Sequence, residues 1–589
     1  MTPAESPRDE PLLDRLSIWA RTRPDAPAYT FIDYFADPDG TARQCTWGQL
    51  HRQATGMAER LRRVARPGER VALLAPSCLE YVVAMVAAWY AGTIAVPLFA
   101  PNLPGQADRL IATYEDCAPA CVVTVPACEA EVRKFVAARR HRAAIVVAGG
   151  DHPADTGQPA PAGWDDVAYL QYSSGSTRAP AGVEITHGNL TANVTQICET
   201  LIGGRERFTG VNWLPLFHDM GLLATVAVPM WAGAEAVFFD PAAFLMQPAR
   251  WLRLLSGRSA AYTAAPNFAY DYCLRRLGPD ELAGLDLRGV FLWLNGAEPV
   301  RPATLESFAD RLRAAGTGLD ENAICPAYGL AEATVFVAAD GIDHRPRVTS
   351  FDRVELAAGR AVPARVGAGR STLASCGRPA GQRVAIVDPE CAVALPDASV
   401  GEIWVHGPNV ASRYWRRPGR SVQVFDAALA DPVPDGLPAG PWLRTGDLGV
   451  LFDGGLYITG RIKDLLIVAG RNHYPQDVEQ TVAEAGRALG RVAAFTVLVD
   501  ERERAIVVAE RSRSAEAADW RPGEIARDAR RAVWRYHDLA LHDIVIAEAG
   551  TIPRTTSGKV SRTACRAWYL AGHGAVTARL AATHGGADA

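Results

Sequence analysis

The sequence predicts an α/β protein with largely parallel sheets, because short apolar strands alternate with helical stretches along its first part. The segments 71–75 (VALLA), 120–125 (ACVVTV) and 143–149 (AAIVVAG) have the length and composition of buried strands. Alternation of this kind is typical of layered folds in which helices cover a parallel sheet. At 589 residues the chain is too long for one hydrophobic core, so we expect two or more domains.

The segment 81–100 (YVVAMVAAWYAGTIAVPLFA) is about long enough and apolar enough to cross a bilayer. The run is broken at Ala91-Gly92-Thr93, and Pro97 follows. This pattern indicates a buried helix that ends near Gly92 and leads into a buried strand. We therefore expect no transmembrane segment.

Segments later in the chain predict a β subdomain, a second domain and an insertion. The strands 383–387 (RVAIV) and 401–406 (GEIWVH) indicate a smaller β subdomain. We expect a large N-terminal domain of layered α/β subdomains over 1–460 and a compact α+β domain over 461–589. The segment 341–372 is polar, rich in Arg and Gly and weakly periodic, and we interpret it as a long insertion, a feature that is often functional.

The composition, 49% hydrophobic and 21% charged, is typical of a soluble enzyme. A net charge of -4 gives no sign of the basic face that binds nucleic acid. The 11 cysteines are scattered, and Cys117 with Cys121 lacks the second half of a zinc site. The acidic N-terminus has no apolar region of the kind found in signal peptides, so we expect a cytoplasmic protein.

Five segments carry side chains suited to phosphate, nucleoside and carboxylate chemistry. The first is 169–190 (YLQYSSGSTRAPAGVEITHGNL), in which a strand meets a Ser/Thr/Gly turn and then a helix that starts near His187 to Asn189. Small residues let backbone N–H groups approach an anion, and hydroxyls add donors, which suits polyphosphate. It is not a Walker A loop, because no Gly-Lys-Ser/Thr closes it. Taken alone, such a turn is more often only a loop.

The second segment, 212–223 (NWLPLFHDMGLL), holds His218 and Asp219 among bulky apolar groups, where a lone His is more often structural. In the third, 326–336 (PAYGLAEATVF), Glu332 is a possible Mg²⁺ ligand and Tyr328 a possible stacking face for a base.

The fourth segment, 442–471, offers Asp447, a carboxylate suited to the two hydroxyls of a ribose, and then Arg461 and Lys463 at the expected domain boundary. The fifth, 550–562 (GTIPRTTSGKVSR), offers Lys559 on a Gly-containing turn.

Together, in this order and at these distances, the five segments resemble the core motifs of the adenylate-forming superfamily: acyl-CoA synthetases, peptide-synthetase adenylation domains and luciferases. The resemblance covers about residues 40–570. Most members have Gly and Lys where this chain has Arg178 and Ala181, and many have Thr at Ala331. The forms SSGSTRAPAGV, PLFHDMGL, YGLAEAT and GRNHYPQDVE look like the fatty acyl-AMP ligase branch, which also carries an insertion near 341–372.

The resemblance implies a role for each candidate residue. Holding the β- and γ-phosphates of ATP is implied for the loop residues Ser173, Ser174, Gly175, Ser176 and Thr177. Shaping the adenine slot is implied for Gly296, Ala297, Glu298, Ala327, Tyr328 and Gly329. It also implies that Asp447 and Arg461 hold the ribose and that Glu332 and Thr177 hold Mg²⁺.

The same resemblance implies three catalytic roles. Lys559 bridges the carboxylate and the α-phosphate, His218 orders the carboxylate, and Lys463 is the hinge about which a mobile C-terminal domain rotates between two steps. The acyl tunnel is expected near Trp213 to Leu223, Val226 to Trp231 and Tyr262 to Tyr270, although core packing explains these aromatic residues equally well.

The expected reaction makes a fatty acyl-adenylate from ATP and then transfers the acyl group to a phosphopantetheine thiol. By resemblance, the thiol belongs to a separate acyl carrier protein or to a carrier domain of a polyketide or peptide synthase. The alternatives are a long- or medium-chain fatty acyl-CoA synthetase, an amino-acid adenylation enzyme, and a non-catalytic nucleotide-binding relative. We also expect the 341–372 insertion to help the enzyme refuse CoA, by docking between the two domains.

Overall fold

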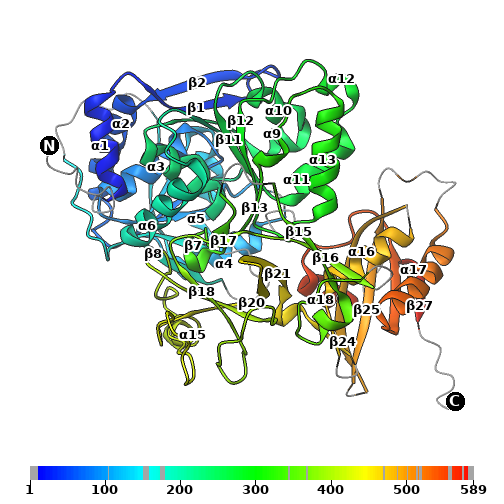
Figure 1. Cartoon of the computed structure of the whole chain (residues 1–589). Coiled ribbons are helices and arrows are strands. Elements are labelled where there is room, and N and C mark those ends of the chain that lie inside the picture. The colour runs from blue at the N-terminus through cyan, green and yellow to red at the C-terminus, as the bar shows by residue number, and fades with distance from the viewer. Residues whose placement is uncertain are drawn as a thin grey trace, which may run out of the picture.

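The computed structural model confirms the α/β fold class, with helices packed on two large sheets that are mainly parallel (Figure 1). It describes residues 11–103, 105–149, 158–172, 180–341, 345–365, 369–468, 471–486, 488–500, 502–512, 515, 520–554, 560–572 and 576–581.

A nine-stranded sheet forms the largest layer, in the order β17-β14-β13-β12-β11-β9-β10-β1-β2. The pairs from β13 through β12, β11, β9 and β10 to β1 are parallel, and the pairs at both edges are antiparallel. Its strands are β1 (Pro27–Asp33), β2 (Thr41–Thr46), β9 (Thr209–Asn212), β10 (Glu235–Phe239), β11 (Ala261–Ala265), β12 (Val290–Asn295), β13 (Ile324–Tyr328), β14 (Ala338–Ala339) and β17 (Arg378–Pro379).

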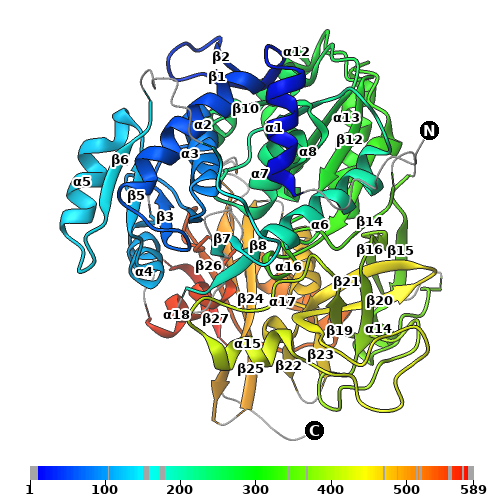
Figure 2. The same cartoon turned by 90° about the vertical axis from the view of Figure 1, so that its left-hand side faces the viewer.

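A six-stranded sheet lies beside it, in the order β6-β5-β3-β4-β7-β8 (Figure 2). All its pairs are parallel except the β7–β8 hairpin. Its strands are β3 (Arg70–Leu73), β4 (Ile94–Pro97), β5 (Cys121–Thr124), β6 (Ala144–Val147), β7 (Val167–Tyr172) and β8 (Gly182–Thr186). The three apolar runs predicted as strands are therefore β3, β5 and β6.

The apolar segment 81–100 forms the helix α3 (Leu79–Tyr90) and then β4, as predicted. Gly92 takes a φ of 71°, a conformation open to glycine at the end of a helix. The helix is apolar on all sides because it is buried on all sides, between α2 and the sheet. Among the described residues, no helix has both the length and the apolarity needed to span a membrane.

Helices cover both sheets. Those before the insertion, besides α3, are α1 (Leu12–Thr22), α2 (Trp47–Arg62), α4 (Ala107–Cys117), α5 (Glu129–Ala137), α6 (His187–Ile197), α7 (Asp219–Leu222), α8 (Val228–Ala232), α9 (Pro241–Met246), α10 (Ala249–Leu255), α11 (Asn267–Arg276), α12 (Pro279–Leu282) and α13 (Pro302–Ala314). As predicted, α6 begins at His187, where Thr186 and Asn189 form a reciprocal capping box.

The predicted β subdomain is an antiparallel sheet of β18 (Arg383–Val387), β19 (Gly401–His406), β20 (Leu443–Phe452) and β21 (Gly455–Arg461). The helix α15 (Pro418–Phe425) packs on β20. The insertion is more regular than its weak periodicity suggests. It contains a hairpin of β15 (Val348–Asp352) and β16 (Arg370–Ala374) with the short helix α14 (Arg353–Ala357), which the Asp352 carboxylate caps.

The chain after β21 gathers on one side of the molecule, drawn in orange and red in Figure 1. Its elements are β22 (Leu466–Val468), β23 (Arg471–His473), α16 (Pro475–Ala485), β24 (Leu489–Val499), β25 (Arg502–Arg511), α17 (Pro522–His537), β26 (Leu541–Ala547), α18 (Arg562–Leu570) and β27 (Val576–Ala581). Alternate residues of its four-stranded sheet enter two small cores, one under α16 and α17 and the other under α18.

We refer to residues 11–461 as the body and to residues 462–581 as the lobe. One large core runs through the body from Leu12 to Leu456, and the first core of the lobe begins at Leu466. The predicted boundary at 460/461 falls between these two cores, and the division into two domains stays a prediction.

Candidate active site

A cleft of about 2970 Å³ opens between the body and the lobe. Its walls come from the carboxyl ends of strands in both large sheets, from β20 and β21, and from the lobe. Ligands bind at the carboxyl ends of strands in open α/β sheets, so this is where a site is expected.

Two backbone segments meet at the adjacent ends of the parallel strands β12 and β13, where Asn295 pairs with Pro326. They are Gly296 to Glu298 and Ala327 to Gly329, the residues predicted to shape the adenine slot. A Cβ on Gly296 would lie 3.2 Å from the Ala327 carbonyl oxygen, so the two backbones approach closely. These segments form one narrow wall of the cleft.

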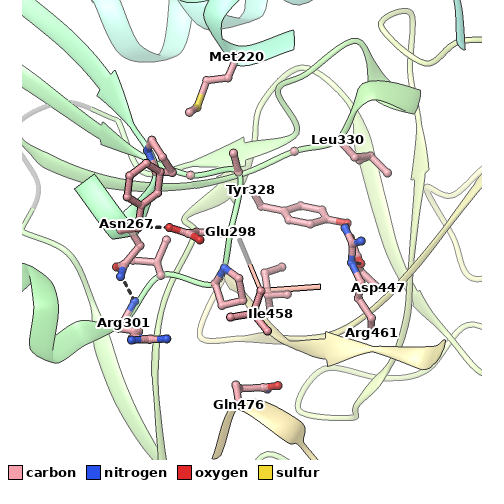
Figure 3. A pocket seen from close by; sticks show the side chains of 18 of the residues that line it. Met220, Asn267, Glu298, Arg301, Tyr328, Leu330, Asp447, Ile458, Arg461 and Gln476 are labelled. Atoms are coloured by element: carbon pink, nitrogen blue, oxygen red, sulfur yellow. Dashed lines mark hydrogen bonds and ion pairs between the residues drawn. The ribbon is translucent and has the colours of Figure 1, made fainter. Parts of the chain in front are cut away.

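Contacts within the protein fix this wall. The Glu298 carboxylate accepts a hydrogen bond of 2.5 Å from the Phe268 backbone N–H, and the Asn267 side chain accepts one of 3.0 Å from the Arg301 N–H (Figure 3). Ala297 has a φ of 66°, in the left-handed region. The slot is thus shaped before any ligand arrives.

Tyr328, Asp447 and Arg461 meet side by side in the cleft (Figure 3). The Tyr328 hydroxyl donates to Asp447 Oδ2 at 2.8 Å, and Arg461 Nε lies 2.7 Å from Asp447 Oδ1. The Asp447 side chain is 6% exposed, whereas that of Arg461 is 53% exposed. Burial and then the Asp447 charge raise the pKa of Tyr328, and the Asp447 charge raises the pKa of Arg461, so a neutral hydroxyl donor and a cation lie on either side of this carboxylate.

Glu332 lies in the cleft on the short helix η6 (Ala331–Ala333). Its Oε1 accepts a hydrogen bond of 2.7 Å from the Tyr414 hydroxyl. Among the described residues, no group of three or more His, Cys, Asp or Glu side chains could form an all-protein metal site. Mg²⁺ usually takes one or two carboxylates together with substrate phosphates and water, so the carboxylate of Glu332 in an open cleft fits that ion.

His218 precedes α7 and lines the cleft. Its Nδ1 lies 2.6 Å from Asp219 Oδ1, and the imidazole is 19% exposed. The carboxylate fixes the orientation of the ring, and the ring remains accessible from the cleft.

The hinge candidate Lys463 lies on the exposed turn η7 (Ile462–Asp464) and lines the cleft. Next to it, Asp464 lies 3.2 Å from Arg562, which also contacts Glu479 at 2.7 Å. Six predicted residues, Ser173, Ser174, Gly175, Ser176, Thr177 and Lys559, lie outside the described residues.

The apolar part of the cleft includes Trp213, Met220, Leu223, Val228 and Tyr262, from the three stretches expected to wall an acyl tunnel. The sequence did not predict a further set from α6, β12 and the π-helix η3 (Cys198–Ile202). These are Ile197, Leu201, Ile202, Leu292 and Leu294.

A second π-helix, η4 (Leu223–Ala227), also borders this apolar region. The Tyr262 hydroxyl donates to the Ala224 carbonyl at 2.5 Å, and the Tyr29 hydroxyl donates to the Val226 carbonyl at 2.8 Å. These side chains satisfy carbonyl groups of an irregular turn, which is a feature common at functional sites.

The fold and the cleft together are those of an adenylate-forming enzyme: a close backbone wall, a buried carboxylate beside it and an apolar cavity share one opening. Residues 16–415 match the family model described as AMP-binding enzyme.

Similar proteins of known name indicate the branch of this family to which the chain belongs. The chain is 44% identical over 557 residues to "Long-chain-fatty-acid--AMP ligase FadD26" of Mycobacterium bovis, covering 93% of this chain and 95% of the relative. It is 43% identical to "4-hydroxyphenylalkanoate adenylyltransferase" of Mycobacterium tuberculosis, covering 95% and 91%. Among solved structures, the fatty acyl-adenylate ligase from L. pneumophila in complex with acyl adenylate and pyrophosphate is similar, with a TM-score of 0.73, 31% identity and coverage of 97% and 98%. The chain belongs to the fatty acyl-AMP ligase branch of the AMP-binding enzyme family.

Proposed function

We propose that this chain uses ATP to convert a fatty acid into an acyl-adenylate and then transfers the acyl group to the phosphopantetheine thiol of an acyl carrier protein. One observation carries the proposal: a single cleft is lined both by an apolar cavity and by the polar side chains of Tyr328, Asp447 and Arg461. A substrate with a long apolar chain and a carboxylate end can therefore meet a nucleotide there.

In the first step a carboxylate oxygen of the fatty acid attacks the α-phosphorus of ATP. A new P–O bond forms, the bond from the α-phosphorus to the bridging oxygen breaks, and pyrophosphate leaves with that electron pair. Two anions must approach each other, so the enzyme's main task is electrostatic.

We assign the residue roles as follows. Asp447 accepts the ribose hydroxyls and Arg461 supports it, the slot at Gly296 to Glu298 and Ala327 to Gly329 holds adenine, and His218 orders the carboxylate. Lys559 contributes the cation between the carboxylate and the α-phosphate. Glu332 and Thr177 would hold Mg²⁺, which supplies positive charge to the phosphates when bound.

In the second step the thiol sulfur attacks the acyl carbonyl. A thioester forms, the bond between the carbonyl carbon and the phosphate oxygen breaks, AMP leaves, and the thiol proton passes to solvent. We propose that the lobe turns about Lys463 between the two steps and so admits the thiol.

The insertion supports the preference for a carrier over CoA, because it binds the lobe. Arg353 donates to the Tyr536 carbonyl at 2.8 Å, and Ser371 donates to the Asp477 carboxylate at 2.9 Å. Tyr474 of the lobe packs in one apolar cluster with Phe351 and Leu356. These contacts limit how far the lobe can turn about Lys463, which is a way to admit the carrier arm and to refuse a substrate that needs a pose beyond that limit.

A second substrate class follows from the relative named for 4-hydroxyphenylalkanoate. Aromatic rings line this chain's apolar cavity. Beside it, the rings of Trp213 and Phe244 are stacked, with 3.8 Å between their centroids. An arylalkanoate can pack on such rings.

The test is to incubate the purified chain with ATP and fatty acids of graded length, or 4-hydroxyphenylalkanoates, and to identify products by mass spectrometry. We expect acyl-adenylate and pyrophosphate, acyl-carrier protein once a cognate carrier is added, and little acyl-CoA when CoA replaces it. Turnover of CoA as fast as of a carrier would favour the acyl-CoA synthetase alternative. Absence of ATP–pyrophosphate exchange with every acid would contradict the proposed chemistry.

A further inference from the structure

The apolar cavity extends along one face of the nine-stranded sheet. Residues two apart on a strand point to the same face. Those that line the cleft are Tyr262, Ala264 and Pro266 along β11, and Leu292, Leu294 and Gly296 along β12. Pro266 and Gly296 follow the carboxyl ends of the two strands, whereas Tyr262 lies near the amino end of β11. At about 3.3 Å per residue from 266 to 262, the cavity reaches about 13 Å into the protein.

Tyr262 lies at the deep end of this cavity. Val290, the next residue inward on the same face of β12, is buried and is not among the described residues that line the cleft. The same holds for Phe208, whose ring packs edge-on against the ring of Tyr262 with 5.7 Å between their centroids. Phe208 in turn packs edge-on against Phe291. The ring of Tyr262 therefore separates the cavity from a packed aromatic cluster.

The position of this ring is fixed from two sides. Tyr262 pairs with Gly210 of the neighbouring strand β9, and a Cβ on Gly210 would lie 2.7 Å from the Tyr262 hydroxyl oxygen. The side chain therefore lies across β9 at a point where glycine leaves it room. At its far end the hydroxyl donates to the Ala224 carbonyl at 2.5 Å.

The sequence of η4 explains why the Ala224 carbonyl accepts side-chain donors. In the π-helical pattern a carbonyl accepts from the N–H five residues later, as Leu223 does from Val228. The corresponding residue for Ala224 is Pro229, which has no N–H. Tyr262 and the Asn212 amide, which donates at 3.1 Å, supply the hydrogen bonds instead.

We propose that Tyr262 sets the longest acyl chain that this enzyme accepts, by closing the deep end of the apolar cavity. The inference rests on the proposed activation of fatty acids and adds to it the residue that limits their length. An acid too long for the cavity must leave methylene groups in the polar part of the cleft or push against a ring that cannot turn away.

Shortening the side chain should lengthen the cavity. With alanine at 262, the space of the ring and its hydroxyl joins the cavity and extends it to Phe208. An apolar space of this kind stays open to apolar ligands when the surrounding core relaxes only in part. The Ala224 carbonyl keeps the hydrogen bond from Asn212.

The experiment measures kcat/KM for acyl-adenylate formation by ATP–pyrophosphate exchange, with saturated fatty acids whose length increases in steps of two carbons. The length limit is the longest acid whose kcat/KM is within about tenfold of that of the best acid. In Tyr262→Ala, acids just beyond the wild-type limit should gain about 10- to 100-fold relative to the best wild-type acid, because each buried methylene group is worth about fourfold. Tyr262→Leu should give a smaller gain. Tyr262→Phe keeps the ring and should keep the length limit.

The matched control is Tyr114→Ala, which removes the same atoms from another buried tyrosine. The Tyr114 hydroxyl donates to the His141 carbonyl at 3.0 Å, and its ring packs edge-on against Phe135 with 5.3 Å between the centroids. Tyr114 is not among the described residues that line the cleft. This variant should lose stability and keep the wild-type length limit.

An unchanged length limit in Tyr262→Ala and Tyr262→Leu would overturn the proposal. A shift in Tyr262→Phe as large as that in Tyr262→Ala would also overturn it, because the hydrogen bond and not the ring would then set the limit. Thermal melting shows which variants are folded, and Tyr262→Leu carries the test if Tyr262→Ala is not. A wild-type chain that forms adenylates from acids of every length equally well would contradict this inference alone. A wild-type chain that forms none would contradict the proposed function.

Discussion

The body and the lobe are built on different principles. The body has one large core that runs from Leu12 to Leu456, with two smaller buried clusters beside it, and its cleft wall is fixed by buried contacts such as that between Tyr328 and Asp447. The lobe has two small cores on the faces of one sheet, and the polar contacts that join it to the insertion are few. Groups that recognise a nucleoside need fixed geometry, whereas a group that serves two chemical steps must be able to move. We therefore expect substitutions in the two regions to fail in different ways.

The largest effect should come from Lys559→Ala, because the proposed mechanism requires this residue of the lobe to act in the cleft of the body. We expect adenylate formation to fall by about 10²- to 10³-fold while ATP still binds, since one cation at a transition state is worth roughly 3–4 kcal/mol. Pyrophosphate exchange and ATP calorimetry measure the two quantities.

The chain has only three lysines among its 61 basic residues, Lys134, Lys463 and Lys559. Lys134 is exposed on α5, so Lys134→Ala is a matched control that should leave both quantities unchanged. Adenylation by Lys559→Ala within tenfold of the wild type would remove Lys559 from the mechanism.

The next effect concerns the fixed wall. Asp447→Asn removes the charge between Tyr328 and Arg461, and we expect ATP and AMP to bind about 10- to 100-fold more weakly, by similar factors. Calorimetry with both nucleotides measures this loss.

The matched control is Asp543→Asn, which removes a buried carboxylate that lies 2.6 Å from Arg579 in the lobe. It should lower the stability of the lobe and leave nucleotide affinity unchanged. If Asp447→Asn weakens ATP but not AMP, Asp447 does not hold the nucleoside.

The lobe should also be acid-sensitive around α17. Burial, Arg353 and His473 lower the pKa of His537 to about 3, and its Nε2 lies 2.7 Å from Thr481 Oγ1. The unfolded lobe therefore binds a proton near pH 6.5 that the folded lobe rejects. The stability from neutral His537 is fully present above about pH 6.5 and declines as pH falls, by about 2 kcal/mol at about pH 5.

Hydrogen exchange in β24 to β26 at neutral pH and at about pH 5 measures this loss, and His537→Gln should reduce it. In the body, burial lowers the pKa of His187 to about 4, so His187→Gln is the matched control that should leave the response of the lobe unchanged. An unchanged acid response of the lobe in His537→Gln would show that other groups cause it.

The smallest effect should come from Lys463→Pro at the junction of the two regions. Proline fixes φ and so hinders a turn that must change conformation. We expect the first step to be nearly unchanged and acyl transfer to the carrier to slow by about tenfold. Separate assays of adenylate and of acyl-carrier protein measure this, with Lys463→Ala as the control. A similar loss in both steps, with circular dichroism and melting unchanged, would mean that Lys463 is not the pivot.

The sequence predicted the fold better than the contacts within the site. Strands β3, β5, β6, β18 and β19 were predictable because each is a short apolar run between loops. The sequence also singled out Tyr328 and Asp447, but only the structure shows that their side chains touch, 119 residues apart.

Two cleft residues gave no local signal in the sequence. Tyr414 contacts Glu332 across 82 residues, and Arg109 contacts Tyr172 across 63. Each depends on which strands and helices become neighbours, and neither periodicity nor a motif encodes that. The hairpin in the insertion could not be predicted from periodicity, because its strands β15 and β16 are short and largely polar.

The tight turn at Gly329 has a consequence for any laboratory evolution of this enzyme. A Cβ at this position would lie 1.6 Å from the Val335 carbonyl oxygen. This oxygen is a backbone atom, so the clash can be relieved only by moving the main chain. Random libraries should therefore keep glycine at position 329, since every other residue carries a Cβ and is expected to disrupt the local backbone there. Varied positions are better chosen at Ile197, Leu201 and Leu292, whose apolar side chains line the cleft and whose exchange changes its shape without moving the backbone segments proposed to hold the nucleotide.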